Sequence, residues 1–212
     1  MKKLILVLLS LMLVATGCTS QSNSKTKSNK SEESTKKLSD KDLKELKEDM
    51  GQLDISLTYY DNFIGNIGYN VQEGMDAETV TAVKEMATKM LTNTQVETNK
   101  NDEKYLEKLN KLPLDTKAKK NYVDNYKKIR QYQNDWIDVL KNFSDQNISE
   151  TATKLKENQD VYLEVSTDLG YARIELLKAA GLTEKQAKEY AQKSIKKIMQ
   201  KYGDPEDVEQ LD

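Results

Sequence analysis

The feature that most constrains this chain is an unbroken series of apolar residues at alternating spacings of three and four between residues 43 and 71. Such a series places all its members on one face of an α-helix and is typical of helices that pack against other helices. Its members are Leu43, Leu46, Met50, Leu53, Leu57, Tyr60, Ile64, Ile67 and Val71. We predict a long amphipathic helix that is capped by Ser39 or Asp40 and ends between residues 64 and 72, where Gly65 and Gly68 weaken it.

A second amphipathic helix is predicted after Asp76, whose side chain is suited to cap it. The first part of its apolar face consists of Val80, Val83, Ala87, Met90 and Thr94. The face turns polar between Glu97 and Asp102, and Pro113 stops the helix. Between Asp102 and Pro113 the apolar pattern resumes with Tyr105, Leu109 and Leu112.

Two further long helices follow. The third is predicted after Asp115, and its apolar face consists of Tyr122, Tyr126, Ile129, Gln133, Trp136, Leu140 and Phe143. The fourth is predicted to open at Ser149 or Thr151 and to end before Gly181, a residue suited to the left-handed position after a helix. Its face consists of Leu155, Asn158, Tyr162, Val165, Leu169, Ala172, Leu176 and Ala179.

A shorter fifth helix is predicted after Thr183, which forms a capping box with Gln186, and Gly203 is expected to end it. Its face contains Ala187, Tyr190, Ile195, Ile198 and Tyr202. Because no strand-like alternation stands out, we predict an all-α fold: an antiparallel bundle of four long amphipathic helices plus the shorter C-terminal helix. Composition agrees, since 32% of residues are charged and only two are proline. An elongated coiled-coil hairpin and an oligomeric coiled coil are the alternatives.

The first 18 residues have the layout of an export signal. Lys2 and Lys3 precede an apolar run over residues 4–14. This run is shorter than the ~20 residues of an ordinary membrane-spanning helix and has the length of a signal peptide's apolar region. The small residues Ala15, Thr16 and Gly17 then precede Cys18.

The Thr16-Gly17-Cys18 sequence resembles the lipobox of bacterial lipoproteins, although Ala15 stands where Leu is commoner. The resemblance covers residues 1–18 only. It implies cleavage between Gly17 and Cys18 and attachment of a diacylglyceryl group to the Cys18 thiol. An ordinary secretory signal is the alternative, but the single cysteine of the chain stands where the lipobox requires one. We therefore expect a lipoprotein held on the extracytoplasmic face of a cell membrane. The Lys-, Asn- and Tyr-rich composition favours a Gram-positive envelope.

This interpretation divides the chain into four segments. Residues 1–17 are the expected signal peptide, and residues 18–38 the lipidated cysteine with a disordered Ser-, Lys- and Asn-rich tether. Residues 39–203 are the expected helical bundle, and residues 204–212 an acidic tail.

Composition excludes several classes of function. The sequence has no histidine, which removes His-based catalysis and His metal sites, and its lone cysteine removes intramolecular disulfides. The net charge of −2 does not suit a nucleic-acid partner. Only Arg130 and Arg173 supply the guanidinium groups that usually read phosphate. We expect no cofactor, no metal and no catalytic residues.

Tyrosines are the remaining candidates for a binding surface, because their rings bury much area and keep a polar group. Most lie on the apolar faces, where core packing is expected. Tyr59, Tyr69 and Tyr132 lie off these faces and are the candidates for a partner patch. We therefore predict a non-catalytic binding or interaction module whose partner is an envelope protein or peptide. The alternatives are a solute-capture lipoprotein that serves a transporter and an envelope enzyme that uses paired carboxylates.

Overall fold

The computed structural model describes residues 37–68, 71 and 75–202, apart from a few side chains inside the helices. The expectations for the signal peptide, Gly17, Cys18, most of the tether, Tyr69 and the acidic tail lie outside the described residues.

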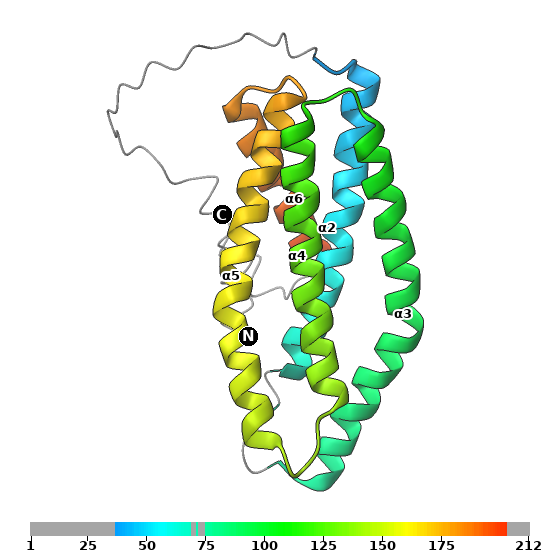
Figure 1. Ribbon diagram of the computed structural model, residues 1–212, viewed down its shortest axis with the longest axis vertical. Coiled ribbons are helices and arrows are strands. Elements are labelled where there is room, and N and C mark those ends of the chain that lie inside the picture. Colours follow the sequence, from blue (N-terminus) through cyan, green and yellow to red (C-terminus); the bar gives the residue numbers. More distant parts are fainter. Residues whose placement is uncertain (1–36, 69–70, 72–74, 203–212) are drawn as a thin grey trace, which may run out of the picture.

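Five helices are present in the described part of the chain, with no strand among them (Figure 1). They are α2 (Asp40–Gly68), α3 (Ala77–Lys111), α4 (Thr116–Lys141), α5 (Ile148–Ala179) and α6 (Glu184–Tyr202). Helices α2 to α5 run antiparallel, each to the next, and α6 is shorter. The predicted all-α bundle is confirmed. None of these helices has the length and apolarity needed to cross a membrane.

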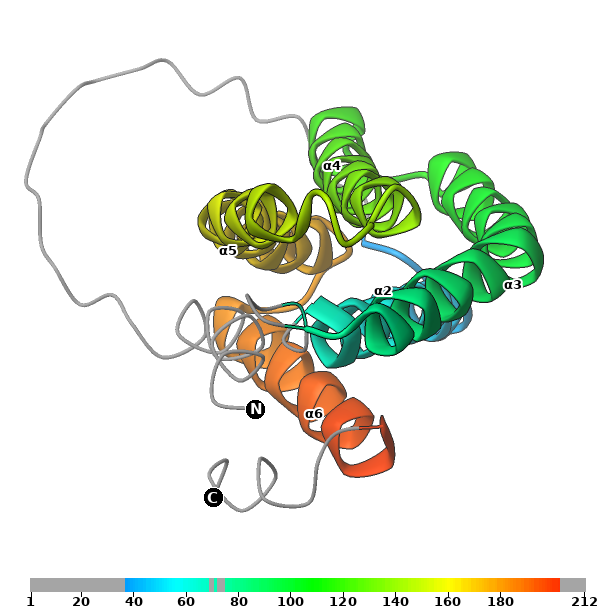
Figure 2. The same cartoon turned by 90° about the horizontal axis from the view of Figure 1, so that it is seen from below.

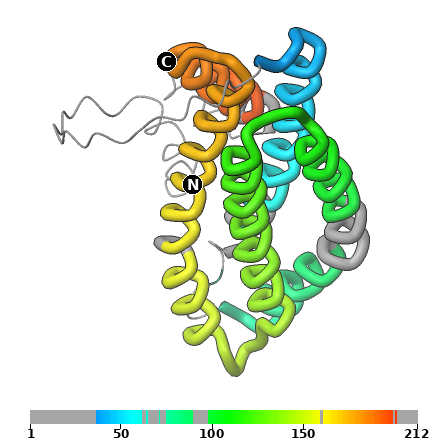
Figure 3. The backbone as a smooth tube through the Cα atoms, turned by 45° about the horizontal axis from the view of Figure 1, so that its top comes forward, coloured from blue at the N-terminus to red at the C-terminus, as the bar shows by residue number. Residues whose placement is uncertain are grey.

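The described connections between the helices lie at the two opposite ends of the bundle. The start of α2, the α3–α4 connection and the α5–α6 connection lie at one end of the bundle (Figure 3). The α4–α5 connection lies at the other end (Figure 1). Figure 2 shows α6 on the side of the bundle away from α4, where it packs against α5 and α2.

Local sequence signals set most helix ends. The Asp76 and Asp115 side chains each accept a backbone N–H three residues ahead, at 2.7 Å in both cases. At the end of α5, Gly181 has a φ of +105°. Its N–H donates to Lys178 O at 2.9 Å and the N–H of Leu182 to Leu177 O at 3.1 Å, which is a Schellman motif.

Two further predictions about helix starts have clear outcomes. The predicted capping box forms, since Thr183 N donates to Gln186 Oε1 at 2.9 Å and Gln186 N to Thr183 Oγ1 at 3.3 Å. The fourth helix begins at Ile148, slightly earlier than predicted. Ile148 packs against the core, and the Asn147 side chain accepts from Ser144 N at 2.8 Å, so it closes the preceding turn instead of capping the helix.

The core consists of two clusters. The larger cluster lies around Met50, Leu53, Tyr122, Leu169 and Leu176, toward the end where α2 starts. The smaller cluster joins the other ends of the helices and contains Tyr60, Ile64, Val71, Val80, Val83, Ala87, Ile137, Leu140, Phe143 and Leu155. Trp136 packs against both clusters. The predicted apolar faces therefore supply the core.

The structure modifies this picture at two places. In α3 the buried residues after the polar stretch are Leu106 and Leu109, whereas Tyr105 and Leu112 are only partly buried. The reason is that Asp102 itself occupies the buried face, and Leu106 and Leu109 follow it at helical spacing. Leu38, assigned above to the tether, packs in the larger cluster, and its N–H donates to Ala180 O at 3.4 Å.

Candidate functional site

The two arginines of the chain are both buried inside the bundle, each beside an aspartate. Arg130 on α4 is 8% exposed and Arg173 on α5 is 2% exposed. Arg130 pairs with Asp102 of α3, and Arg173 pairs with Asp54 of α2. A buried charge requires a partner of opposite charge and further hydrogen bonds. The arginines therefore mark the polar centres of the molecule.

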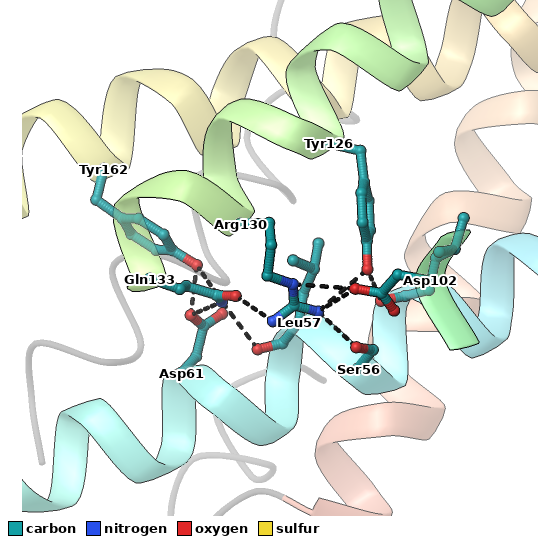
Figure 4. Close-up of polar contacts among 9 residues, drawn as sticks. Ser56, Leu57, Asp61, Asp102, Tyr126, Arg130, Gln133 and Tyr162 are labelled. Carbon is teal, nitrogen blue, oxygen red and sulfur yellow. Dashed lines mark hydrogen bonds and ion pairs between the residues drawn. The ribbon is translucent and has the colours of Figure 1, made fainter. Parts of the chain in front are cut away.

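Arg130 is the centre of a network that joins α2, α3 and α4 (Figure 4). Its Nε and Nη2 donate to Asp102 Oδ2 at 3.0 and 2.7 Å. Nη2 also donates to Ser56 Oγ on α2. The guanidinium lies 4.4 Å from the centre of the Tyr60 ring, a cation–π distance. One side chain thus contacts three helices at mid-bundle.

Gln133 extends this network to α5. Its Oε1 accepts from Arg130 Nη1 at 2.6 Å, and its Nε2 donates to Asp61 Oδ1 at 2.7 Å and to Leu57 O at 3.1 Å. The Tyr162 hydroxyl of α5 also donates to Asp61 Oδ1. Hydrogen bonds therefore connect Arg130 to Tyr162 of α5 through Gln133 and Asp61 (Figure 4).

Asp61 has an unusual electrostatic environment, because its own hydrogen-bond donors, Tyr162 and Gln133, are both neutral. Burial raises the pKa of Asp61 from 3.8 to about 6, although Tyr162, Gln133 and Arg130 oppose this rise. Burial also raises the pKa of Tyr162 well above its ordinary value, so the phenol keeps its proton and remains a donor. Asp61 can therefore titrate near neutral pH.

The second centre joins α2, α5 and α6. Arg173 Nη2 donates to Asp54 Oδ1, and Ser194 of α6 donates to Asp54 Oδ2 at 3.4 Å. Nearby, the Tyr190 hydroxyl of α6 donates to Lys47 O at 2.7 Å. Burial raises the pKa of Asp54, opposed by Arg173 and Ser194. This centre fixes α6 to the outside of the α2–α5 pair.

The described surface offers several open grooves. One of about 570 Å³ lies between the first turns of α3 and the α4–α5 connection, with Val80 and Phe143 in its wall. Another, of about 420 Å³, lies along α6 beside Glu184 and Lys188. A third, of about 260 Å³, lies beside Asp135, Asp138 and Glu150. Within the described ranges, no group of carboxylates is arranged to hold a metal ion.

The tyrosines predicted to form a partner patch lie on different helices. Tyr59 on α2 is 44% exposed, with its ring edge-to-face against Tyr60. Tyr132 on α4 is partly buried against the larger cluster. Sequence reasoning missed three other exposed apolar side chains, Met86 at 48%, Val161 at 38% and Tyr171 at 50%. Of the two candidates among the described residues, only Tyr59 is exposed.

Sequence reasoning also did not predict the buried network around Arg130, although the sequence contained signals of it. In a chain where lysine supplies nearly all the positive charge, arginine occurs at only two positions, and both are buried. Gln133 interrupts an otherwise apolar face, and Asp102 lies where the face of α3 turns polar. Polar residues at core positions of paired helices often specify register, but the pairing of Arg130 with Asp102 depends on the tertiary structure.

Comparison of the chain with protein-family models, with curated proteins and with solved structures found no match.

Proposed function

We propose that this chain is a lipid-anchored, non-catalytic binding or interaction module on the extracytoplasmic face of a bacterial cell membrane. The observation that carries the proposal is the position of its single cysteine, Cys18, directly after Gly17 and an apolar run that follows Lys2 and Lys3. Two or more acyl chains give firm attachment where one chain gives only marginal binding. The expected partner is an envelope protein or peptide.

The chemistry of the helical body supports a binding role over a catalytic one. The buried charges of Arg130, Asp102, Arg173 and Asp54 are engaged in ion pairs between helices. Asp54 and Asp61 do line one cleft, but its free volume is about 30 Å³. Pockets for small molecules usually have ~300–1,000 Å³. A sugar ring therefore does not fit between these carboxylates.

The all-α architecture also bears on the solute-capture alternative. Such lipoproteins usually have two α/β lobes, whereas the described residues form helices only. The open groove between α3 and the α4–α5 connection, with Val80 and Phe143 in its wall, suits an extended or helical segment of a protein partner.

The anchor is tested by replacing the acceptor of the lipid. In Cys18→Ser, labelling by a fatty-acid probe should be lost, and the protein should be unprocessed or shed from the membrane. Ser20→Ala, two residues further along, is the matched control and should be labelled and retained like the wild type. Unchanged labelling and retention in Cys18→Ser would contradict the lipoprotein assignment.

The partner is tested in the same cells by crosslinking. A photo-reactive residue in place of Lys84, which is exposed in the wall of the groove, or of the exposed Tyr59 should capture an envelope protein or peptide, and one at the exposed Tyr171 of α5 serves for comparison. Recovery of lipid alone from all three positions would contradict a partner-binding role and leave the anchor result standing.

A further inference from the structure

A polar seam runs between α2 and α5. On α2 it consists of Asp54, Thr58 and Asp61, and on α5 of Arg173, Ser166 and Tyr162. The helices are antiparallel, so Asp54 meets Arg173 at one end and Asp61 meets Tyr162 at the other. Thr58 and Ser166 come between these two pairs in the sequence of each helix.

The seam lines a narrow cleft that α6 covers. Ile195 and Ile198 of α6 and Ile129 and Leu169 of the bundle complete its wall. The free volume of about 30 Å³ gives room for about one or two water molecules and for no larger ligand.

Two polar atoms of the residues that line the cleft have no hydrogen-bond partner among the described residues. They are Ser166 Oγ and Arg173 Nε. The Tyr122 hydroxyl interacts with Arg173 from outside the lining of the cleft and is also without a partner of hydrogen-bond geometry in the described part of the chain. Ser166 is 1% exposed and Arg173 is 2% exposed, so bulk water does not reach them freely. Buried polar groups are satisfied by protein or by ordered water in the large majority of cases.

The charges in the wall select the ligand. Arg173 Nε can only donate a hydrogen bond, so it needs an acceptor, and its positive charge repels a cation. The carboxylates of Asp54 and Asp61 can accept further hydrogen bonds and repel an anion. Ser166 can donate or accept. Only a small neutral molecule that both donates and accepts satisfies this wall, and water is such a molecule.

We infer that the cleft beneath α6 is an internal hydration site, in which about one or two water molecules bridge Ser166 Oγ and Arg173 Nε to the carboxylates of Asp54 and Asp61. The water completes the hydrogen bonding of the seam, which allows α6 to close over it with isoleucine side chains. The site is independent of the anchor and of any partner.

The number of long-lived internal waters tests this inference. Oxygen-17 magnetic relaxation dispersion of the full chain should detect at least one such water in the wild type. Ser166→Val removes the hydroxyl and fills the cleft, so at least one long-lived water should disappear. Thr167→Val is the matched control, since the Thr167 hydroxyl donates to Leu163 O at 2.9 Å, and it should leave the count unchanged. Equal counts in the wild type and a folded Ser166→Val overturn the inference.

A second measurement needs no variant. A crystal structure of the wild-type chain, at a resolution that shows ordered water, should place a water oxygen within hydrogen-bond distance of Ser166 Oγ and the same or a second water oxygen within hydrogen-bond distance of Arg173 Nε. A metal ion at this position overturns the inference. So does a direct protein partner for both atoms with nothing between them.

Discussion

At the scale of the residue, this bundle uses its few guanidinium groups as buried connectors between helices. Arg130 reaches Asp102, Ser56 and Gln133 on three helices, a task for which a flexible lysine with a single ammonium group is poorly suited. A buried ion pair is not by itself a large source of stability, but removing one partner is costly because the other charge stays buried.

Arg130→Met should lower the free energy of unfolding by about 3–5 kcal/mol, because Asp102 then remains buried without a cation. The measurement is urea unfolding followed by circular dichroism. Lys128→Met, at an exposed site on the same helix, should change stability by no more than about 0.5 kcal/mol. The double variant Arg130→Met, Asp102→Leu should recover much of the loss. A midpoint for Arg130→Met equal to that of the wild type would contradict the role of the pair.

Asp61 should make stability fall as pH rises. Its pKa is about 6 in the folded protein and near 3.8 when unfolded, so the folded state holds the proton more tightly. Below pH ~4 the Asp61 carboxyl is protonated in both states and does not lower the free energy of unfolding. Above pH ~6 it is ionised in both states, and its ionisation in the folded state lowers the free energy of unfolding by up to about 3 kcal/mol.

Asp61→Asn removes this titration while its amide oxygen can still accept from Tyr162 and Gln133, which both donate to Oδ1 in the wild type. The stability of Asp61→Asn minus that of the wild type should therefore increase between pH 4 and pH 8. Asp168→Asn, at an exposed site on α5, is measured over the same pH range as the control for the substitution itself. A flat difference for Asp61→Asn would show that this carboxyl group has an ordinary pKa.

At the scale of the element, short-range capping contacts determine where the helices begin and end, and the spacing of apolar residues determines which helix face is buried. The capping contacts of Asp76, Asp115 and Thr183 all involve a residue three positions ahead, so they need no distant partner. Gly181 differs, because it combines a left-handed backbone with a close approach of Lys37 from the start of the described chain.

Two glycine substitutions should therefore have opposite signs. Gly181→Ala should destabilise the protein by roughly 1–2 kcal/mol, because its φ of +105° strains an L-residue and the new Cβ would lie 2.9 Å from Lys37 Cγ. Gly51→Ala should stabilise it by ~0.5–1 kcal/mol, because Gly51 lies inside α2 and a Cβ there meets nothing within 4 Å. Thermal unfolding measures both. Stabilisation by Gly181→Ala would contradict the Schellman geometry.

At the scale of the whole molecule, the two hydrophobic clusters divide the bundle along its length. The larger cluster joins all five described helices, whereas the smaller joins only α2, α3, α4 and α5. Trp136 and the Arg130 network lie between them. Local opening is expected where fewer buried contacts hold the helices.

Native-state hydrogen exchange should reveal this division. Backbone amides around Leu140 and Leu155, in the smaller cluster, should exchange through openings of lower free energy than amides around Tyr126 and Leu176, in the larger cluster. The pH and temperature are held constant so that intrinsic exchange rates are known. Equal opening free energies at both ends would indicate one cooperative unit.

The sequence by itself determined the helices, their faces and most of their ends, because these depend on residues three or four positions apart. The 3–4 spacing from Leu43 to Val71 and the caps at Asp76 and Thr183 needed no knowledge of the fold. The antiparallel order also followed, since short connections between long helices leave few other arrangements.

Only the tertiary structure decided which polar residues meet. Asp102 and Arg130 are 28 positions apart and Asp54 and Arg173 are 119 apart, so their pairing depends on how the helices are rotated and aligned against one another. Helical periodicity places a residue on a face but does not state which residue of another helix lies opposite. The seam between α2 and α5, the placement of α6 over it and the high pKa of Asp61 arise from that long-range alignment.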